Sequence, residues 1–277
     1  MDFVNFAKAH GIVIDSYPPL GRWKRYPTVD HPKKRNGAVR WMGDHGFVQN
    51  WAVDQNVAVW KGDASVDVDR IKRQVDRAEA KRRFQQSQAA RKAREIIRDS
   101  VLAKHAYLEA KGFPDAEGLV WSDQTVKRLV IPMRVGGQVV GCQLIDEDGT
   151  KKFLFGQQSG GAEYIIDNKG PHVLVEGYAT ALSVQAALKS MKRAYTLHVC
   201  FSAGNLVKVA KHLPRGFVVA DNDESLAGEK AAKDTGWPYW MPPTAGQDFN
   251  DFHREVGLFK CSMSLHKAMI SAAIPSR

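Results

Sequence analysis

The second half of the chain alternates short apolar runs with segments of helical composition. We expect strands over residues 172–176, 196–201 and 216–220, and helices over residues 179–190, 203–213 and 226–234. Continuous apolar runs that are separated by single helices are typical of a parallel sheet covered on both faces. The pattern therefore predicts an α/β domain.

A different pattern precedes this domain. Three strands are expected over residues 129–134, 138–145 and 151–155. Gly136-Gly137 separates the first two strands, and Asp148-Gly149 separates the last two, which are combinations that favour tight hairpins. We therefore expect an antiparallel β-meander.

No Gly or Pro occurs from Ala64 to Lys111, and the composition of this segment favours a long helix. Between Arg70 and Arg98 there are eleven basic residues against three acidic residues, so this stretch carries most of the formal net charge of +10. Two interpretations stay open, a solvated helical linker and a basic arm that binds nucleic acid. Both place a domain boundary here.

Residues 1–63 interleave aromatic residues with cations, and short alternating runs over residues 38–41 and 57–60 predict strands of a small sheet. Single-stranded nucleic acid is bound by aromatic rings that stack on bases and by cations that meet phosphates. The alternative is that the tryptophans form the core of a small domain. The candidate DNA-binding residues are Trp23, Arg25, Lys33, Lys34, Arg35, Arg40 and Trp41.

The composition narrows the class of protein. With 277 residues, 44% hydrophobic and 25% charged, the chain has the composition of a soluble globular protein of one large or two modest domains. No apolar run approaches the roughly 18 residues of a membrane span, and the start lacks the order of a signal peptide. We expect a cytoplasmic protein without a membrane partner, in the host cytoplasm if it is phage-encoded.

The three cysteines are Cys142, Cys200 and Cys261, and they form no CxxC pair. This spacing predicts buried structural thiols in a reduced compartment and excludes a zinc ribbon.

Acidic residues follow two of the predicted parallel strands. Glu176 and Gly177 end the first strand, with the glycine expected to permit a tight turn, and Asp221 and Asp223 follow the third. Carboxyl ends of parallel strands share one edge of a sheet, so these carboxylates should lie together. A single such acid is commonly a loop residue or a helix cap, but clustered carboxylates call for a cation such as Mg²⁺.

These residues carry a family resemblance. EGYATA (176–181), SAGNL (202–206), VVADND (218–223) and DFND (248–251) resemble, in order, the motifs of Toprim-domain DNA primases of the phage and plasmid α-type. Residues 103–112, the meander over residues 130–156 and RNGAVRWMG (35–43) also resemble that group, so the likeness extends over nearly the whole chain.

The resemblance implies an organisation of five segments. A small N-terminal α+β module (1–63) and a basic helical connector (64–111) would precede the meander of the primase core (112–168). A Toprim catalytic domain (169–257), with a parallel sheet and flanking helices, and a C-terminal tail (258–277) would follow.

The resemblance also implies residue roles. Glu176 would be the general base or a metal-associated carboxylate for the attacking 3′-hydroxyl, and Asp221 and Asp223 would hold Mg²⁺ or Mn²⁺. Asp248 would supply an auxiliary acidic site. The family motif there reads Asp-x-Asp, whereas this chain has Asn250 with Asp251 after it.

Nucleotidyl transfer also needs cations for the triphosphate. The candidates in and beside the meander are Lys127, Arg128, Arg134, Lys151 and Lys152.

The expected function is that of a DNA primase that makes short RNA primers on a single-stranded DNA template from ribonucleoside triphosphates. The alternatives are a Toprim nuclease that cleaves phosphodiesters and a catalytically inactive nucleic-acid-binding accessory protein of replication. The chain has no GxxxxGK[ST] phosphate loop, so a replicative helicase, if one is needed, would be a separate protein.

Overall fold

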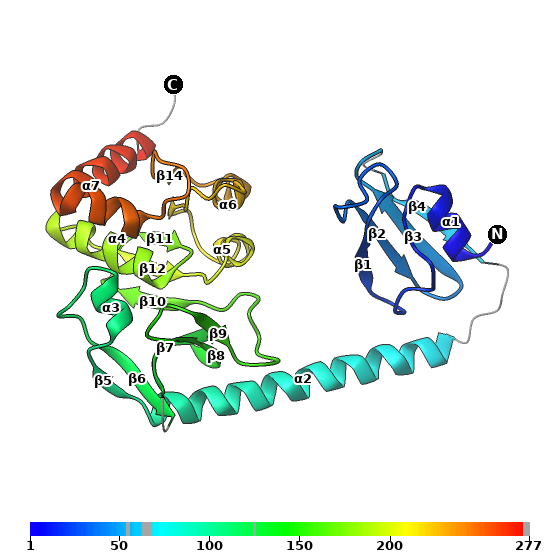
Figure 1. Cartoon of the computed structure of the whole chain (residues 1–277), viewed down its shortest axis with the longest axis horizontal. Helices are drawn as coiled ribbons and strands as arrows, with labels where there is room; N and C mark the ends of the chain where they lie inside the picture. Colours follow the sequence, from blue (N-terminus) through cyan, green and yellow to red (C-terminus); the bar gives the residue numbers. More distant parts are fainter. Residues whose placement is uncertain (54–55, 63–67, 124–125, 274–277) are drawn as a thin grey trace. The chain divides into compact units, whose positions relative to one another are not determined.

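The structure of the chain, a computed structural model, describes residues 1–53, 56–62, 68–123 and 126–273. The chain divides into two compact units, Met1–Arg83 and Phe84–Arg277 (Figure 1).

The N-terminal unit contains a helix packed on a small antiparallel sheet. Helix α1 (Phe3–Ala9) precedes strands β1 (Trp23–Tyr26), β2 (Gly37–Trp41), β3 (His45–Asn50) and β4 (Ala58–Lys61), which pair in sequence order. The Asp2 carboxylate accepts a hydrogen bond from the Asn5 backbone N–H at 2.8 Å and so caps α1. Phe3, Ala7, Ile12, Ile14, Val39 and Val48 form the core of this unit. The two strands predicted in this region are confirmed.

The long helix is shorter than the sequence indicated. Helix α2 (Val68–Arg98) is followed by strand β5 (Val101–Ala103) and helix α3 (Ala106–Ala110), whereas a long helix was expected within residues 64–111. The Ser100 hydroxyl donates to the Ile96 carbonyl at 2.6 Å, where α2 ends. β5 then pairs with strand β6 (Gly118–Asp123), a tertiary interaction that helix propensity cannot report.

The β-meander is confirmed. Strands β7 (Val126–Val135), β8 (Gln138–Ile145) and β9 (Lys151–Phe153) complete an antiparallel sheet in the order β5-β6-β7-β8-β9. Because side chains alternate along a strand, the sheet has two different faces. Leu129, Ile131 and Ile145 belong to the main core, and Val130 and Leu144 form a second cluster, to which Ala93 and Ile96 of α2 contribute.

A second five-stranded sheet is mostly parallel, as the apolar runs predicted. Its order is β10 (Tyr164–Asp167), β12 (Thr196–Val199), β11 (His172–Val175), β13 (Phe217–Val219) and β14 (Tyr239–Trp240), with β10 alone antiparallel to its neighbour. The helices between these strands are α4 (Tyr178–Ser190), α5 (Ala203–Ala210) and α6 (Ala227–Thr235). The α/β fold class is therefore confirmed.

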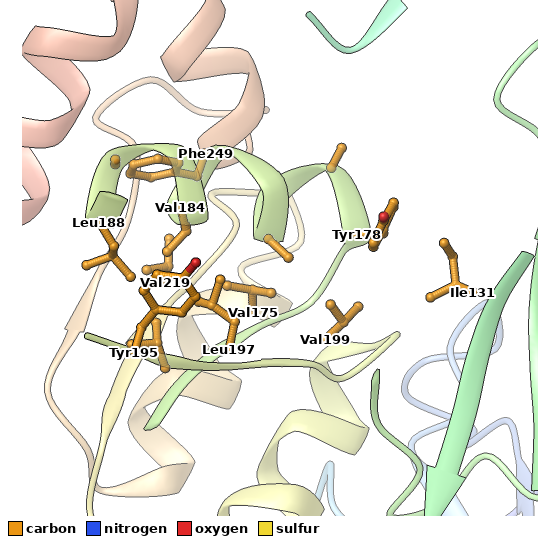
Figure 2. Packing of buried hydrophobic residues seen from close by; sticks show 14 of the residues in the cluster. Ile131, Val175, Tyr178, Val184, Leu188, Tyr195, Leu197, Val199, Val219 and Phe249 are labelled. Atoms are coloured by element: carbon orange, nitrogen blue, oxygen red, sulfur yellow. The ribbon is translucent and has the colours of Figure 1, made fainter. Parts of the chain in front are cut away.

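Helices cover both faces of this sheet (Figure 1). On one face, Val175, Val199 and Val219 lie with α4 residues such as Val184 and with Phe249 of helix α7 (Phe249–Ala273) in one core cluster (Figure 2). On the other face, the sheet residues pack against α5 and α6 in a second cluster that includes Leu174, Leu206, Val218 and Ala232. Strand residues therefore alternate between two buried environments.

The direction of the strand connections reverses beside β11. From β11 the chain crosses through α4 to β12 on one side, and through α5 it returns past β11 to β13 on the other side. The connections that leave β11 and β13 thus run in opposite directions. In open α/β sheets a reversal of this kind opens a ligand-binding crevice at the carboxyl ends of the two strands.

Helix α7 continues well beyond the predicted acidic turn. It bends at Gly257, whose φ of 81° is in the left-handed region, and Cys261 and Leu265 beyond the bend are fully buried. All three cysteines are buried and unpaired, which confirms the expected structural thiols. Across the described ranges, every helix is too short or too polar to cross a bilayer.

Candidate active site and nucleic-acid interface

Glu176 follows β11 directly and is held at the sheet edge by backbone hydrogen bonds. The Phe201 backbone N–H, just past β12, donates to the Glu176 carbonyl at 2.8 Å. Gly177 is the N-cap of α4 with a φ of −106°, which any L-residue adopts. The expectation that this glycine was needed for a tight turn is therefore wrong, because the strand passes into the helix in ordinary extended geometry.

The Glu176 carboxylate is mostly buried, and its pKa is raised. Burial is the larger cause and the charge of Asp223 adds to it, whereas Lys151 and the Ala203 backbone amide act in the opposite direction. Ala203 is the first residue of α5, so the positive end of that helix faces the carboxylate. Glu176 thus lies between a cation, a helix end and a second carboxylate.

Asp221 is the most perturbed acid of the group. Burial raises its pKa to about 7, and the charges of Glu176, Asp248 and Asp223 contribute, while Lys151 lowers it. One carboxylate oxygen, Oδ1, is buried and has no hydrogen-bond partner. A buried carboxylate oxygen without a donor is costly, so the position demands either a proton or a cation.

Asp248 is brought to Asp221 by a backbone bridge between two loops. The Asn222 N–H donates to the Gln247 carbonyl at 2.9 Å, and these residues form an isolated antiparallel bridge. Asp248 also caps α7, since its Oδ1 accepts from the Asp251 N–H at 2.8 Å while Asp251 accepts from the Asp248 N–H at 3.3 Å. Asp251 is therefore part of a helix cap.

Asp223 has a structural function at the start of α6. Its carboxylate accepts from the backbone N–H groups of Ala227 at 3.1 Å and Gly228 at 2.9 Å, and from the Ser225 hydroxyl. These bonds, with that of Ser225 first, lower the pKa of Asp223. Asp223 is therefore ionised and directed at the helix, and its charge still acts on Glu176 and Asp221.

Gly228 permits the close approach of α6 to Asp221. A Cβ on Gly228 would lie 2.3 Å from the Asp221 carbonyl oxygen, which is far inside contact distance. The sequence analysis did not identify this position. A glycine in the first turn of a helix was the available signal, because it needs a packing explanation.

Asn250 faces the interior. Its side-chain amide donates to the Lys111 carbonyl and to the Ser183 hydroxyl, both at 2.9 Å, and the residue is fully buried. In place of a second acid, this turn therefore has an amide that joins α7 to α4 and to the end of α3.

We call Glu176, Asp221, Asp223 and Asp248 the acidic group. Of the five cations predicted for the triphosphate, the structure brings Lys151 to this group. β9 pairs Lys151 with Ile145 and Phe153 with Gln143, so Lys151 and Phe153 share the face of the meander that carries Ile145 into the main core. From this face the Lys151 ammonium acts on Glu176 and Asp221.

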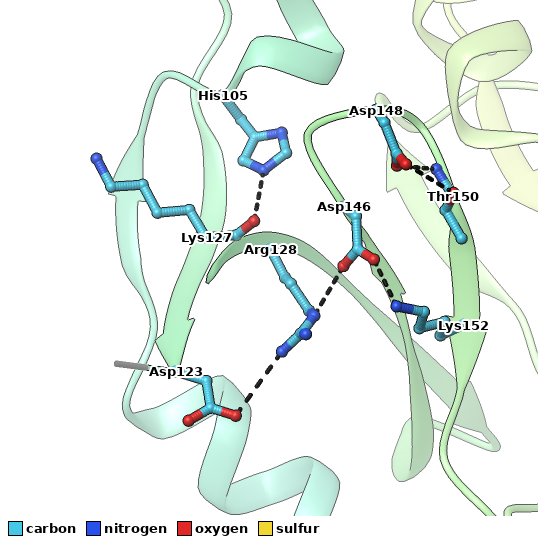
Figure 3. A network of polar contacts seen from close by, with 8 residues as sticks. All are labelled: His105, Asp123, Lys127, Arg128, Asp146, Asp148, Thr150 and Lys152. Carbon is cyan, nitrogen blue, oxygen red and sulfur yellow. Dashed lines mark hydrogen bonds and ion pairs between the residues drawn. The ribbon is translucent and has the colours of Figure 1, made fainter. Parts of the chain in front are cut away.

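The structure places the other four cations elsewhere. Arg128 and Lys152 both bind Asp146, at 2.7 and 2.6 Å (Figure 3). The Lys127 carbonyl lies 3.3 Å from His105 Nε2 while its side chain extends away from that contact (Figure 3). Arg134 donates to the Gly137 carbonyl at 3.0 Å in the β7–β8 turn.

A cavity of about 270 Å³ lies between α3 and the β8–β9 turn, with Tyr107, Lys111, Glu147 and Lys151 among its lining residues. Burial, with a contribution from the Asp248 charge, raises the pKa of Tyr107 to about 12. Lys151 and Tyr107 therefore connect this cavity to the acidic group, and a ligand there would lie beside it.

The acidic group fits a hard divalent cation in part. Asp221 offers a buried oxygen without a donor, and three further carboxylates raise its pKa. Among the described residues, however, no three His, Cys, Asp or Glu side chains converge on one point as a closed metal site. Mg²⁺ does not require such a cage, because it commonly binds one or two carboxylates together with water and substrate phosphates.

The part of the chain that holds the acidic group is similar to a known protein family. Residues 172–258 match the family described as Toprim domain. The matched residues include Glu176, Asp221, Asp223 and Asp248. The chain is also similar to a solved structure described as a DNA primase domain from Pseudomonas aeruginosa, with 16% sequence identity and a TM-score of 0.33. That match covers 58% of this chain and 55% of the other, so this chain spans about half of its length.

Outside the matched residues, the N-terminal sheet presents a second candidate site. Strand pairing places Trp23 opposite Arg40 and Arg40 opposite Phe47, and Arg25 shares their face as the second residue after Trp23. The Arg25 guanidinium lies 3.8 Å from the Trp51 ring centroid, and the rings of Trp23 and Phe47 are 6.2 Å apart. This face, away from α1, therefore carries aromatic rings and cations together.

The remaining candidates of the N-terminal unit are placed differently. Trp41 lies on the opposite side of β2, where it packs against the core of the unit and contacts Tyr17 at 4.7 Å. Lys33, Lys34 and Arg35 are exposed on the loop before β2. Phe47 and Trp51, which the sequence analysis did not select, belong to the aromatic face instead.

The polar side chains of His198 and Ser202 have structural partners. His198 and Cys200 are buried, and His198 is hydrogen-bonded to Glu163 at 2.6 Å and to His172 at 2.9 Å. Ser202 is a helix cap, since its hydroxyl accepts from the Asn205 N–H at 3.3 Å.

Proposed function

We propose that the protein is a DNA primase of the phage or plasmid kind whose motifs it resembles. It synthesises short RNA primers on single-stranded DNA from ribonucleoside triphosphates by metal-dependent nucleotidyl transfer. The observation that carries the proposal is the buried, unpartnered Asp221 oxygen in a Toprim domain, at the strand edge that also brings Glu176, Asp223, Asp248 and Lys151 together.

Each side chain has a distinct part in this proposal. Glu176 accepts the proton of the attacking 3′-hydroxyl, and its raised pKa makes it a stronger base for that purpose. Asp221 and Asp248 hold Mg²⁺ or Mn²⁺, and Asp223 orients the loop through its bonds to α6. When bound, the cation neutralises charge on the triphosphate and the leaving group. Lys151 contributes a fixed positive charge that also stabilises the negative charge of the triphosphate.

The N-terminal aromatic face would hold the template. Bases stack on rings such as Trp23 and Trp51 while Arg25 and Arg40 meet phosphates, which is the chemistry of single-strand binding without sequence preference. The basic residues of α2 add to the electrostatic attraction.

The test is a primer-synthesis assay on the full chain. Single-stranded DNA, labelled ribonucleotides and Mg²⁺ should give short oligoribonucleotides, and Glu176→Gln should reduce their formation about 100-fold or more. Asp234→Asn is the matched control, because Asp234 is an exposed acid of α6 that pairs with Lys230. Its activity should equal that of the wild type.

Absence of product across templates and metals would contradict the proposal. Metal-dependent degradation of DNA or RNA without ribonucleotides, abolished by Glu176→Gln, would identify a Toprim nuclease instead. Metal binding with neither activity would identify a binding protein of replication.

A further inference from the structure

Two phenylalanines that contact each other, Phe153 and Phe201, adjoin Lys151 and Glu176, and Phe155 follows Phe153 on the same segment. None of the three has a place in the proposed chemistry. Phe153 shares a strand face with Lys151, and its ring meets that of Phe201 edge to face, with centroids 6.4 Å apart. Phe155 follows two residues later and is 87% exposed. Phe153 is also 47% exposed, so two large rings two residues apart in the chain are open to solvent.

Phe201 is held in a costly backbone conformation. Its φ of 67° is in the left-handed region, which a bulky residue rarely adopts. The hydrogen bond from its N–H to the Glu176 carbonyl and its packing against the main core maintain this conformation. The strained backbone therefore ties the Phe153–Phe201 ring pair to the residue proposed as the general base.

Phe155 is presented on a constrained turn. Gln157 Oε1 accepts from the Leu154 N–H at 3.2 Å and from the Cys142 N–H at 3.1 Å, which fixes the turn to β8. Gly156 has a φ of 76°, and a Cβ there would lie 2.9 Å from the Cβ of Gln85 in α2. Sequence neighbours on both sides are thus anchored while the Phe155 ring points into solvent.

We propose that Phe153, Phe155 and Phe201 form a stacking surface for an unpaired base of the single-stranded template, next to the acidic group. The choice of a DNA template as the occupant rests on the proposed function. The site is separate from the aromatic face of the N-terminal sheet.

Charge and position favour a polynucleotide strand as the occupant. Lys151 lies on the same strand as Phe153, and the exposed Lys208 lies beside the loop that leads from Phe155, since a Cβ on Gly160 would be 3.5 Å from its Nζ. β9 is the edge strand of its sheet, so a chain can pass along it. Exposed rings next to cations are the combination that binds bases and phosphates of one strand.

The experiment measures single-strand binding by the full chain carrying Glu176→Gln, without ribonucleotides. The probes are a labelled oligothymidylate and an abasic sugar–phosphate strand of the same length. Phe155→Ala should weaken oligothymidylate binding about 5-fold or more and leave abasic-strand binding unchanged. Phe155→Trp, which keeps a stacking ring, should retain the affinity.

Phe259→Ala is the matched control, because Phe259 is a 78% exposed phenylalanine of α7 that lies beyond the bend at Gly257. It should not change the affinity for either strand. Photocrosslinking of an oligonucleotide that contains 5-iodouracil should in addition place adducts on Phe153, Phe155 or Phe201.

The proposal would be overturned if Phe155→Ala and Phe259→Ala lowered the affinity for oligothymidylate equally. It would also be overturned if Phe155→Ala lowered the affinity for the abasic strand as much as the affinity for oligothymidylate. Weaker binding of a ribonucleoside triphosphate with unchanged binding of DNA would overturn it as well, and would make the occupant the incoming nucleotide. Because this assay needs no turnover, its outcome is independent of the primer assay. Stacking without primer synthesis would refute only the proposed activity.

Discussion

Glu176 and Asp221 follow two adjacent parallel strands, β11 and β13, and burial together with the charge of Glu176 raises the pKa of Asp221 to about 7. Two buried acids in this relationship repel each other when both are ionised, so the folded protein stores electrostatic free energy at the sheet edge. A cation that binds there recovers this energy, which makes the site measurable without catalysis.

Asp221→Asn should stabilise the metal-free protein in a pH-dependent way. The raised pKa means that Asp221 favours folding at low pH, and that this contribution is lost as pH rises from about 4 to about 7. The variant cannot ionise, so in EDTA it should exceed the wild type at about pH 8 by on the order of 2–4 kcal/mol and match it near pH 4. Urea unfolding measures both free energies.

Mg²⁺ should then raise the thermal midpoint of the wild type more than that of Asp221→Asn, because the variant has lost a metal oxygen. A difference in stability that is the same at both pH values, or equal shifts with Mg²⁺, would contradict the assignment of Asp221.

Lys151 and Lys152 are adjacent in the chain and should behave differently. Lys151 acts on Glu176 and Asp221, whereas Lys152 pairs with Asp146 at 2.6 Å. Lys151→Gln should lower primer synthesis about 10-fold or more. Lys152→Gln removes a partly exposed ion pair, so its rate should stay within about twofold of the wild type. Equal losses of primer synthesis in the two variants would contradict the role assigned to Lys151.

Gly228→Ala should disturb the acidic group through the backbone. The new Cβ would overlap the Asp221 carbonyl, so α6 must move, at a cost of about 1–3 kcal/mol in unfolding free energy and with reduced activity. In Gly204→Ala the Cβ meets nothing within 4 Å, and we expect a gain of about 0.5–1 kcal/mol from helix propensity. Denaturant unfolding of the pair checks both signs, and a neutral Gly228→Ala would refute the close approach.

Replacing Trp23, Arg25 and Arg40 by alanine should weaken single-stranded DNA binding about 10-fold or more. Two fewer phosphate contacts should also reduce the slope of log affinity against log salt by about 1.4. Lys189→Ala with Lys267→Ala removes the same number of charges from exposed positions elsewhere and is the control. An unchanged slope in a folded triple variant would exclude the N-terminal face as the template site.

Much of the C-terminal fold followed from local pattern. The apolar runs that became β11, β12 and β13 and the hairpins of the meander were predictable, because alternation and turn residues are properties of neighbours in sequence. The end of α2 was not, because residues 101–103 have no local reason to leave a helix and do so to pair with β6. Trp41 was likewise grouped with Trp23 by composition, but strand alternation directs it to the core.

The sequence by itself determined which acids follow which strands, and therefore that Glu176, Asp221 and Asp223 would meet at one edge of a parallel sheet. Only the tertiary structure decided what each carboxylate does there. Burial and neighbouring charge leave an Asp221 oxygen without a donor, whereas the amides of α6 engage Asp223 and those of α7 engage Asp248. The same holds for Lys151, because charge interactions and burial depend on distances between elements that no local pattern contains.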